Sequence, residues 1–182
     1  MRTTQLTLGA LAAVATSALT GLGIASPATA VTAAAEQAAT TTTHEVGNVI
    51  ECTGTVRGRG VYASLYENNH HPDVIQVVIG DGAHQVGGSR EVAGGFIDHK
   101  QVHGSLKVGG RKAVIEGYAS RRVKRLPIHE EYDDAGQHIT VDGYHRKLAK
   151  DLTLTWRSRT VPLHCDNAFF YDLQVTKEDI TG

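Results

Sequence analysis

Alternation of apolar and polar residues with a period of two constrains the fold of this chain more than any other feature. The clearest case is Asp151–Arg157, where Leu152, Leu154 and Trp156 alternate with charged and hydroxyl side chains. Successive side chains of an extended strand point to opposite faces of a sheet, so this pattern predicts a strand with one buried and one exposed face. Helical periodicity is absent from the sequence after the first 30 residues.

The same alternation recurs along most of the remaining sequence. It is found in Val49–Val56, Val61–Tyr66, Val74–Ile79, Leu106–Val108, Ala113–Ala119, Ile128–Tyr132, His138–His145 and Phe169–Thr176. Turn residues separate these stretches. Gly109-Gly110 can adopt the positive φ of a two-residue hairpin loop, and Asp133–Gly136 predicts a second hairpin. Short half-polar strands joined by tight turns predict an all-β fold, a single antiparallel β-barrel or β-sandwich of about eight or nine strands.

The first 30 residues have the composition of a secretory signal peptide. Arg2 gives a positive start, Leu6–Ala25 carries no charge, and Ala28 and Ala30 are small residues at the spacing that a signal peptidase reads. An uncleaved membrane anchor is the alternative, because Leu6–Ala25 approaches the roughly 20 residues of a spanning helix, although its Ala, Gly and Thr content makes a weak anchor. We expect cleavage between Ala30 and Val31 and a secreted, extracellular protein.

Beyond the leader, the sequence predicts one folded domain. Residues 31–43 are rich in Ala and Thr and lack large apolar side chains, so we expect a flexible lead-in, followed by a β-domain over residues 44–182. The whole chain has 18 Lys plus Arg and 19 Asp plus Glu, for a formal net charge of −1. This balance argues against a nucleic-acid partner. No later uncharged stretch is long enough to span a bilayer, so we expect no membrane association after cleavage.

The chain contains two cysteines, Cys52 in the first predicted strand and Cys165 just before the last. An exported protein meets an oxidising environment, which favours a disulfide between them; two buried free thiols are the alternative. The bond would join residues 113 positions apart. In the chain-entropy description, closing a loop of that length stabilises the fold by about 5 kcal/mol.

Five short motifs and the Ala-rich leader are distributed over nearly the whole sequence. The motifs are Glu51–Gly54 (ECTG), Leu65–Asn69 (LYENN), Val108–Ala113 (VGGRKA), Asp133–Gly136 (DDAG) and Pro162–Phe169 (PLHCDNAF). In this combination the chain resembles uncharacterised secreted β-proteins of actinobacteria. The motifs are structural rather than catalytic, so the resemblance implies no activity or ligand.

Ten histidines, all after residue 30, are the unusual feature of the composition. Neutral imidazole binds metals and carries protons near neutral pH. If Asp133–Gly136 all lie in the hairpin loop, Glu131 faces His138 and His129 lies two residues away on the same face, which gives a possible zinc ligand set. A three-residue loop would instead place Tyr132 opposite His138 and separate the cluster, and a solvated polar face is a further alternative. We expect no cofactor other than this possible zinc ion.

The densest basic run comprises Arg121, Arg122, Lys124 and Arg125. Such a run can bind an anionic polymer, for example one of the cell wall, and protonation of the histidines at acidic pH would strengthen that attachment. It can also enter the acidic specificity site of a trypsin-like protease as an inhibitor loop. A third interpretation is a charged edge that discourages association between strands.

No catalytic motif accompanies these features in the sequence. We find neither the serine of a strand-turn-helix elbow nor a phosphate-binding loop. The sequence therefore favours a secreted non-enzymatic β-domain, a module that binds a ligand or a surface in the mouth of a barrel or along an exposed loop. A small extracellular metal-dependent hydrolase that uses a His-rich site is the alternative, and a protease inhibitor is the third hypothesis.

Overall fold

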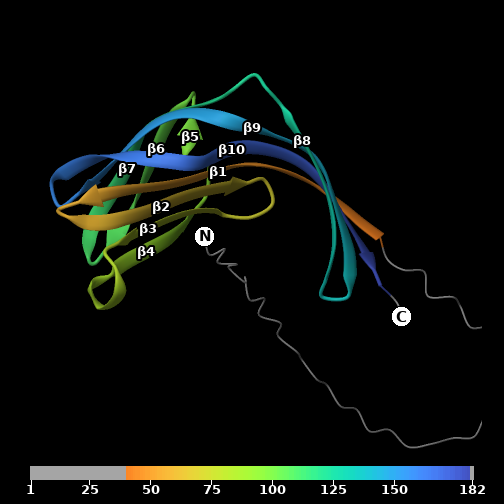
Figure 1. Ribbon diagram of the computed structural model, residues 1–182, viewed down its shortest axis with the longest axis horizontal. Coiled ribbons are helices and arrows are strands. Elements are labelled where there is room, and N and C mark those ends of the chain that lie inside the picture. The colour runs from red at the N-terminus through yellow and green to blue at the C-terminus, as the bar shows by residue number, and fades with distance from the viewer. Residues whose placement is uncertain (1–39, 181–182) are drawn as a thin grey trace, which may run out of the picture. The chain divides into compact units, whose positions relative to one another are not determined.

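The computed structural model describes residues 40–180 of this protein, and they form one antiparallel sheet curled into a half-barrel (Figure 1). The strands are β1 (Thr40–Val56), β2 (Arg59–Asn68), β3 (Asp73–Ile79), β4 (Val86–Val92), β5 (Ile97–Asp98), β6 (Gln101–Val108), β7 (Arg111–Arg121), β8 (Leu126–Asp134), β9 (Gln137–Trp156) and β10 (Arg159–Asp179). Their order is β4-β3-β2-β1-β10-β9-β7-β6-β5, and β8 also pairs with β9. A short 3-10 helix, η1 (Gly82–His84), links β3 to β4. The predicted all-β antiparallel class is confirmed.

The N-terminal boundary of the sheet differs from the sequence prediction. β1 begins at Thr40, so residues 40–43, which we assigned to a flexible lead-in, belong to the sheet and pair with residues 175–178 of β10. Threonine is β-branched and favours the extended conformation when a neighbouring strand is available for backbone hydrogen bonding. The predicted signal peptide, with its cleavage point between Ala30 and Val31, lies outside the described residues. Within residues 40–180 there is no helix long and apolar enough to cross a membrane.

The apolar core fills the half-barrel. Leu152, Leu154 and Trp156 are all fully buried, as the alternation in β9 predicts. The indole Nε1–H of Trp156 donates to the carbonyl oxygen of Val108, 3.2 Å away, which satisfies the one polar atom of this side chain. β4 and β6 also meet across the curled sheet. A Cβ atom at Gly88 of β4 would overlap the backbone of β6, so the close approach of these strands requires glycine there.

Three strands are long enough to extend beyond the half-barrel. Residues 148–156 of β9 pair with β7, whereas residues 137–145 of the same strand pair with β8. We call the arm the four-stranded part made of β8, residues 137–147 of β9, residues 169–179 of β10 and residues 40–50 of β1, which lies to the right in Figure 1. The long strand β9 thus connects the half-barrel to the arm.

A β-bulge in β10 marks the point where the arm leaves the half-barrel. The β9–β10 ladder stops at the pair of Leu163 with Leu152 and resumes, with shifted register, at the pair of Phe169 with Lys147. The β1–β10 ladder shifts at the same place. An extra residue in one strand bends it and increases its local twist, so the bulge accounts for the change of direction.

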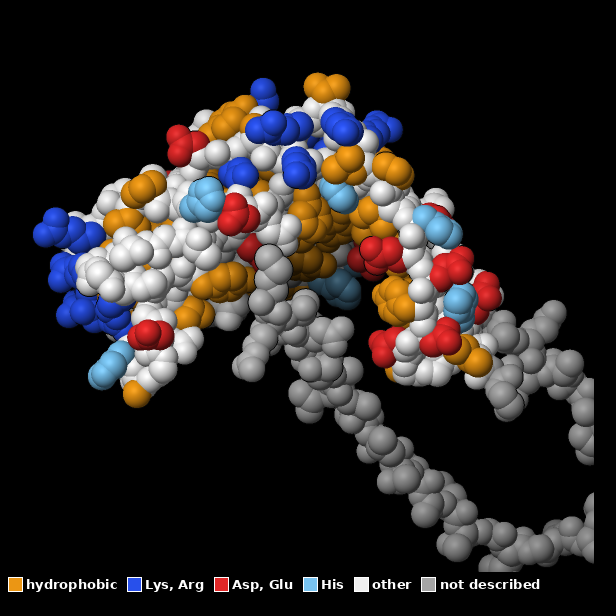
Figure 2. Space-filling model, in the orientation of Figure 1, with side chains coloured by type: hydrophobic (Ala, Val, Ile, Leu, Met, Phe, Trp, Pro, Cys, Tyr) orange, Lys and Arg blue, Asp and Glu red, His pale blue; other side chains and the backbone are white. Residues whose placement is uncertain are grey.

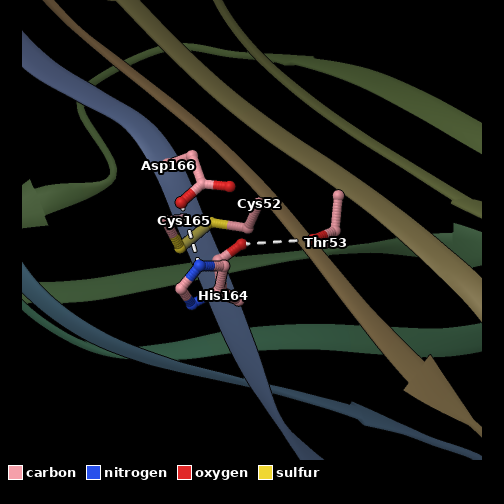
Figure 3. The surroundings of a disulfide bond; sticks show 5 residues. All are labelled: Cys52, Thr53, His164, Cys165 and Asp166. Atoms are coloured by element: carbon pink, nitrogen blue, oxygen red, sulfur yellow. Dashed lines mark hydrogen bonds and ion pairs between the residues drawn. A yellow bond between two sulfur atoms is a disulfide. The ribbon is translucent and has the colours of Figure 1, made fainter.

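A disulfide fixes this bulge to the neighbouring strand. Cys52 of β1 and Cys165 of β10 are bonded, which confirms the predicted pairing (Figure 3). On either side of Cys165, the imidazole Nε2 of His164 lies 2.9 Å from the Asp166 carboxylate, and the hydroxyl of Thr53 donates to the His164 carbonyl. The bond therefore ties β1 to the bent segment of β10 rather than to a regular ladder.

Candidate functional site

The basic run predicted from the sequence forms the crossover from β7 to β8. The backbone N–H of Arg122 donates to the carbonyl oxygen of Lys147 at 2.9 Å, and the Arg122 carbonyl accepts from Nε of Arg146 at 2.6 Å. Both backbone groups of Arg122 are thus bonded to β9. The start of the crossover is therefore held against the middle of β9, whereas Val123, the next residue, is 91% exposed.

Two arginines at the ends of this crossover pack over aromatic rings. The guanidinium carbon of Arg121 lies 3.5 Å from the ring centroid of Phe170, and that of Arg125 lies 4.5 Å from the centroid of Tyr144. A cation over the face of an aromatic ring is attracted by the negative charge density of that face. These stacks restrict the two side chains and so hold their charges in place.

The strand beneath the crossover contributes further cations. Arg146, Lys147 and Lys150 of β9 lie beside it, and Figure 2 shows Lys and Arg side chains gathered at the top of the molecule, over β9 and the β7–β8 connection. We call this region the basic surface. It comprises Arg121, Arg122, Lys124, Arg125, Arg146, Lys147 and Lys150.

The cations of the basic surface have no carboxylate partner. Among residues 40–180 there are seven ion pairs, and each of them is formed by a histidine with Asp or Glu. None of the Lys and Arg side chains in this part of the chain has a nitrogen within 4.0 Å of a carboxylate oxygen. The basic surface is therefore free to attract an external anion.

The mouth of the half-barrel opens beside the basic surface. A pocket of about 410 Å³ lies there, and its lining includes Arg121, Lys100, Asn48 and Ile97. The amide of Asn48 donates to the Glu67 carboxylate, which also accepts the N–H groups of residues 96 and 97, so the polar groups on this side of the mouth are bonded to each other. Arg121 thus lines the mouth and also belongs to the basic surface.

The predicted zinc residues lie on the β8–β9 hairpin of the arm, with a register that differs from the one considered above. Only Ala135 and Gly136 form the loop, with φ of 50° and 79°, because Asp134 already pairs with Gln137. Two consecutive residues with positive φ make the type I′ turn typical of two-residue hairpins. The four-residue loop that would place Glu131 opposite His138 is not formed.

This register gives His129 and His138 a carboxylate each. His138 lies opposite Asp133, with Nδ1 2.8 Å from the carboxylate, and His129 lies opposite Asp142, at 2.6 Å. Glu131 is 3.5 Å from Nε2 of His129. Within residues 40–180, no group of three or more His, Cys, Asp and Glu side chains is arranged to hold a metal ion.

The carboxylates change the titration of these histidines. The hydrogen bond that His129 donates to the Asp142 carboxylate raises the pKa of His129, and the bond that His138 donates to the Asp133 carboxylate raises the pKa of His138. Nearer the half-barrel, hydrogen bonds from His44 and then Tyr144 lower the pKa of the Asp172 carboxyl. Opposite charge and hydrogen bonding to the charged form have these effects. The arm therefore carries a row of histidine–carboxylate pairs.

A buried polar cluster, which the sequence did not reveal, joins β2, β3 and β10. The hydroxyl of Tyr171 accepts from the amide of Asn68 at 2.8 Å and lies 3.2 Å from the hydroxyl of Tyr66, and burial raises the pKa of Tyr171. The backbone N–H of Asn68 donates to Asp73. Since these groups bond to one another, the cluster stabilises the fold and leaves no polar group directed at a ligand.

Sequence reasoning found four of the seven residues of the basic surface. It identified the four cations of the crossover, which are nearly consecutive, but not Arg146, Lys147 and Lys150, which are more than 20 positions further along the chain. They join the crossover because β7 and β8 pair with successive parts of the same strand. A sequence pattern gives the faces of a strand but not its partners, so no local signal predicted this meeting.

Comparison with known proteins adds little. No family model and no curated protein matches this chain. A crystal structure of a Nitrosomonas europaea protein, provisionally named AttH, is similar to it with 10% sequence identity and a TM-score of 0.31. The match covers 76% of this chain and 52% of the other, so the chain spans about half the length of that protein.

Proposed function

We propose that this protein is a secreted, non-enzymatic β-domain that binds anionic polymers of the cell surface through its basic surface. The observation that carries the proposal is the gathering of Lys and Arg side chains over β9 and the β7–β8 connection (Figure 2), where none of the seven has a carboxylate partner among the described residues. The leader sequence and the disulfide support export, because disulfides persist in oxidising compartments.

Local rather than overall charge has to drive this binding. The formal net charge of the chain is −1, so the whole molecule is not attracted to a polyanion at neutral pH. Several unpaired cations in one region create a positive potential that extends over about one Debye length, roughly 8 Å at physiological ionic strength. A polymer with a charge on every repeat can contact several of these side chains at once.

Part of the basic surface is ordered before any ligand binds. Arg121 and Arg125 are stacked on Phe170 and Tyr144, and the backbone of Arg122 is bonded to β9 on both sides. Holding charged side chains in place lowers the entropy cost of binding, which favours recognition over diffuse attraction. The same contacts are compatible with phosphate or carboxylate repeats, since arginine binds both.

Retention on purified bacterial cell wall and on immobilised long-chain polyphosphate tests the proposal. Lys124→Glu combined with Arg125→Glu reverses two charges of the basic surface. An exposed ion pair contributes roughly 0.5 kcal/mol and reversal makes it repulsive, so two reversals cost about 2 kcal/mol, on the order of thirtyfold in affinity. Neutral dextran resin gives the background.

A matched control reverses two cations at the other end of β7. Lys107→Glu combined with Lys112→Glu changes the net charge equally, on the exposed β6–β7 hairpin. We expect retention of this control within about twofold of the native protein. Equal losses in both double variants would show that binding does not depend on the basic surface, and absence of retention on either material would refute the proposal.

A further inference from the structure

A second pocket adjoins the basic surface on the side of the β10 bulge. Its volume is about 530 Å³, within the range of sites that hold small molecules. Its lining combines three cations, Arg122, Lys147 and Lys150, with the apolar side chains of Ile128 and Phe169. The pocket that contains Arg121 at the mouth of the half-barrel is separate from it.

The backbone architecture creates this pocket. Between residues 164 and 168 of β10 and residues 148 and 151 of β9 the two strands form no ladder pairs, because the bulge shifts the register. On the adjoining residues of β9, 146 and 147, the neighbouring strand changes from β7 to β8. The sheet is therefore interrupted on both sides of β9, at consecutive stretches of that strand. The disulfide at Cys165 holds the bulge in place.

The cations of this pocket remain available for a ligand. Asp166 is the one acidic residue among the lining side chains, and its carboxylate is 2.9 Å from the imidazole of His164. The amide of Asn167, also in the lining, donates to Glu51. Asp166 and Asn167 thus bond to residues outside the pocket lining. Lys147 and Lys150 have no carboxylate within ion-pair distance among residues 40–180.

The apolar part of the pocket is half-buried. Leu148 and Ala168 at its base are buried, while Ile128 and Phe169 are partly exposed. The imidazole of His145 lies tilted against the ring of Phe169, with 5.7 Å between centroids, and supports that ring. Apolar side chains that are only partly covered gain stability when a ligand removes them from water.

We infer that this pocket binds a small amphipathic anion. Arg122, Lys147 and Lys150 hold its carboxylate, sulfonate or phosphate group, and its aromatic or short aliphatic part packs against Ile128 and Phe169. A surface that binds only a polyanion has no use for the apolar wall, so this inference goes beyond the proposed function and does not depend on it. The two sites share Arg122, Lys147 and Lys150.

Fluorescence titration with 1-anilinonaphthalene-8-sulfonate tests the inference, because this probe combines a fused aromatic ring with one anionic group. N-phenyl-1-naphthylamine has the same aromatic skeleton without the sulfonate and is the neutral control. We expect saturable binding of the sulfonate, and binding of the neutral probe at least about tenfold weaker, the difference that corresponds to one charge-assisted hydrogen bond.

Variants locate the binding. Lys147→Glu combined with Lys150→Glu lowers the affinity for the sulfonate at least about tenfold, and Ile128→Asp does so from the apolar side. Lys124→Glu combined with Arg125→Glu changes the charge of the same region outside the pocket lining and leaves the sulfonate affinity within about twofold. Far-UV circular dichroism and thermal unfolding establish that each variant is folded.

The outcomes separate this inference from the proposed function. Equal binding of both probes, or unchanged sulfonate binding in Lys147→Glu/Lys150→Glu and in Ile128→Asp, would overturn the inference even if polymer retention is observed. Saturable sulfonate binding that is weakened in Lys147→Glu/Lys150→Glu and in Ile128→Asp would support the inference even if the protein is not retained on any polymer.

Discussion

Removal of the Cys52–Cys165 bond should destabilise the protein by several kcal/mol. The bond joins residues 113 positions apart. In the chain-entropy description, removing a bond that closes a loop of this length raises the entropy of the unfolded chain and so lowers its free energy by about 5 kcal/mol. Removing a native disulfide from an exported domain usually costs about 2 to 5 kcal/mol of stability. The double variant Cys52→Ala/Cys165→Ala removes the bond without leaving a free thiol.

Urea unfolding followed by the fluorescence of Trp156 measures the effect, since this single tryptophan is buried in the core. We expect a lower midpoint and a larger dependence of the unfolding free energy on urea, because an unfolded chain without the bond expands and exposes more surface. The native protein treated with reductant should behave like the variant.

A small loss of unfolding free energy on removal of the bond would refute this reasoning. If the double variant and the reduced protein lose less than about 1 kcal/mol, the bond does not restrict the unfolded chain as the loop length requires. A large loss with an unchanged urea dependence would place the effect in the folded state instead, as a relaxation of the β10 bulge that the bond fixes.

Three further predictions concern separate parts of the chain. Gly47→Ala should prevent folding or lower stability by more than about 3 kcal/mol, because the new Cβ would overlap the backbone of β2 and the hydroxyl of Tyr171; soluble yield and thermal unfolding measure this. NMR titration should give His129 a pKa above about 6.5, and Asp142→Asn should lower it. Because the His129 pKa is raised in the folded protein, the stabilisation from the His129–Asp142 pair is complete below the unfolded pKa and disappears as the pH rises through the folded pKa. A His129 pKa that does not change in Asp142→Asn would contradict the pairing. Protein secreted into the medium should begin at Val31, as N-terminal sequencing would establish, and a chain retained in membranes with its leader would contradict this prediction.

The strands were predictable from the sequence because alternation is a local property. In β9, the alternation alone assigns Leu152, Leu154 and Trp156 to one face of the strand, whichever strands lie beside it. All three side chains are buried. The Gly109-Gly110 hairpin was predictable for the same reason, since both residues adopt positive φ there.

Features that depend on strand partners were not predictable. Ala135 adopts a positive φ that its residue type does not favour, so the sequence suggested a longer loop and a different register for His138. Residues 40–43 form a strand only because β10 extends far enough to pair with them. The bulge near Cys165 and the exchange of β7 for β8 beside β9 arise from the whole sheet, and together they bring Lys147 and Lys150 to the crossover.

The most direct test of polyanion binding is the salt dependence of affinity for end-labelled linear polyphosphate, measured by fluorescence anisotropy. Because each bound cation releases condensed counterions from the polymer, the logarithm of the binding constant should fall linearly with the logarithm of the salt concentration. We expect Lys124→Glu/Arg125→Glu to make the slope shallower by about 0.7 for each side chain that no longer neutralises a phosphate, while Lys107→Glu/Lys112→Glu leaves it unchanged. A binding constant independent of salt, or the same slope in all three proteins, would contradict binding through the basic surface.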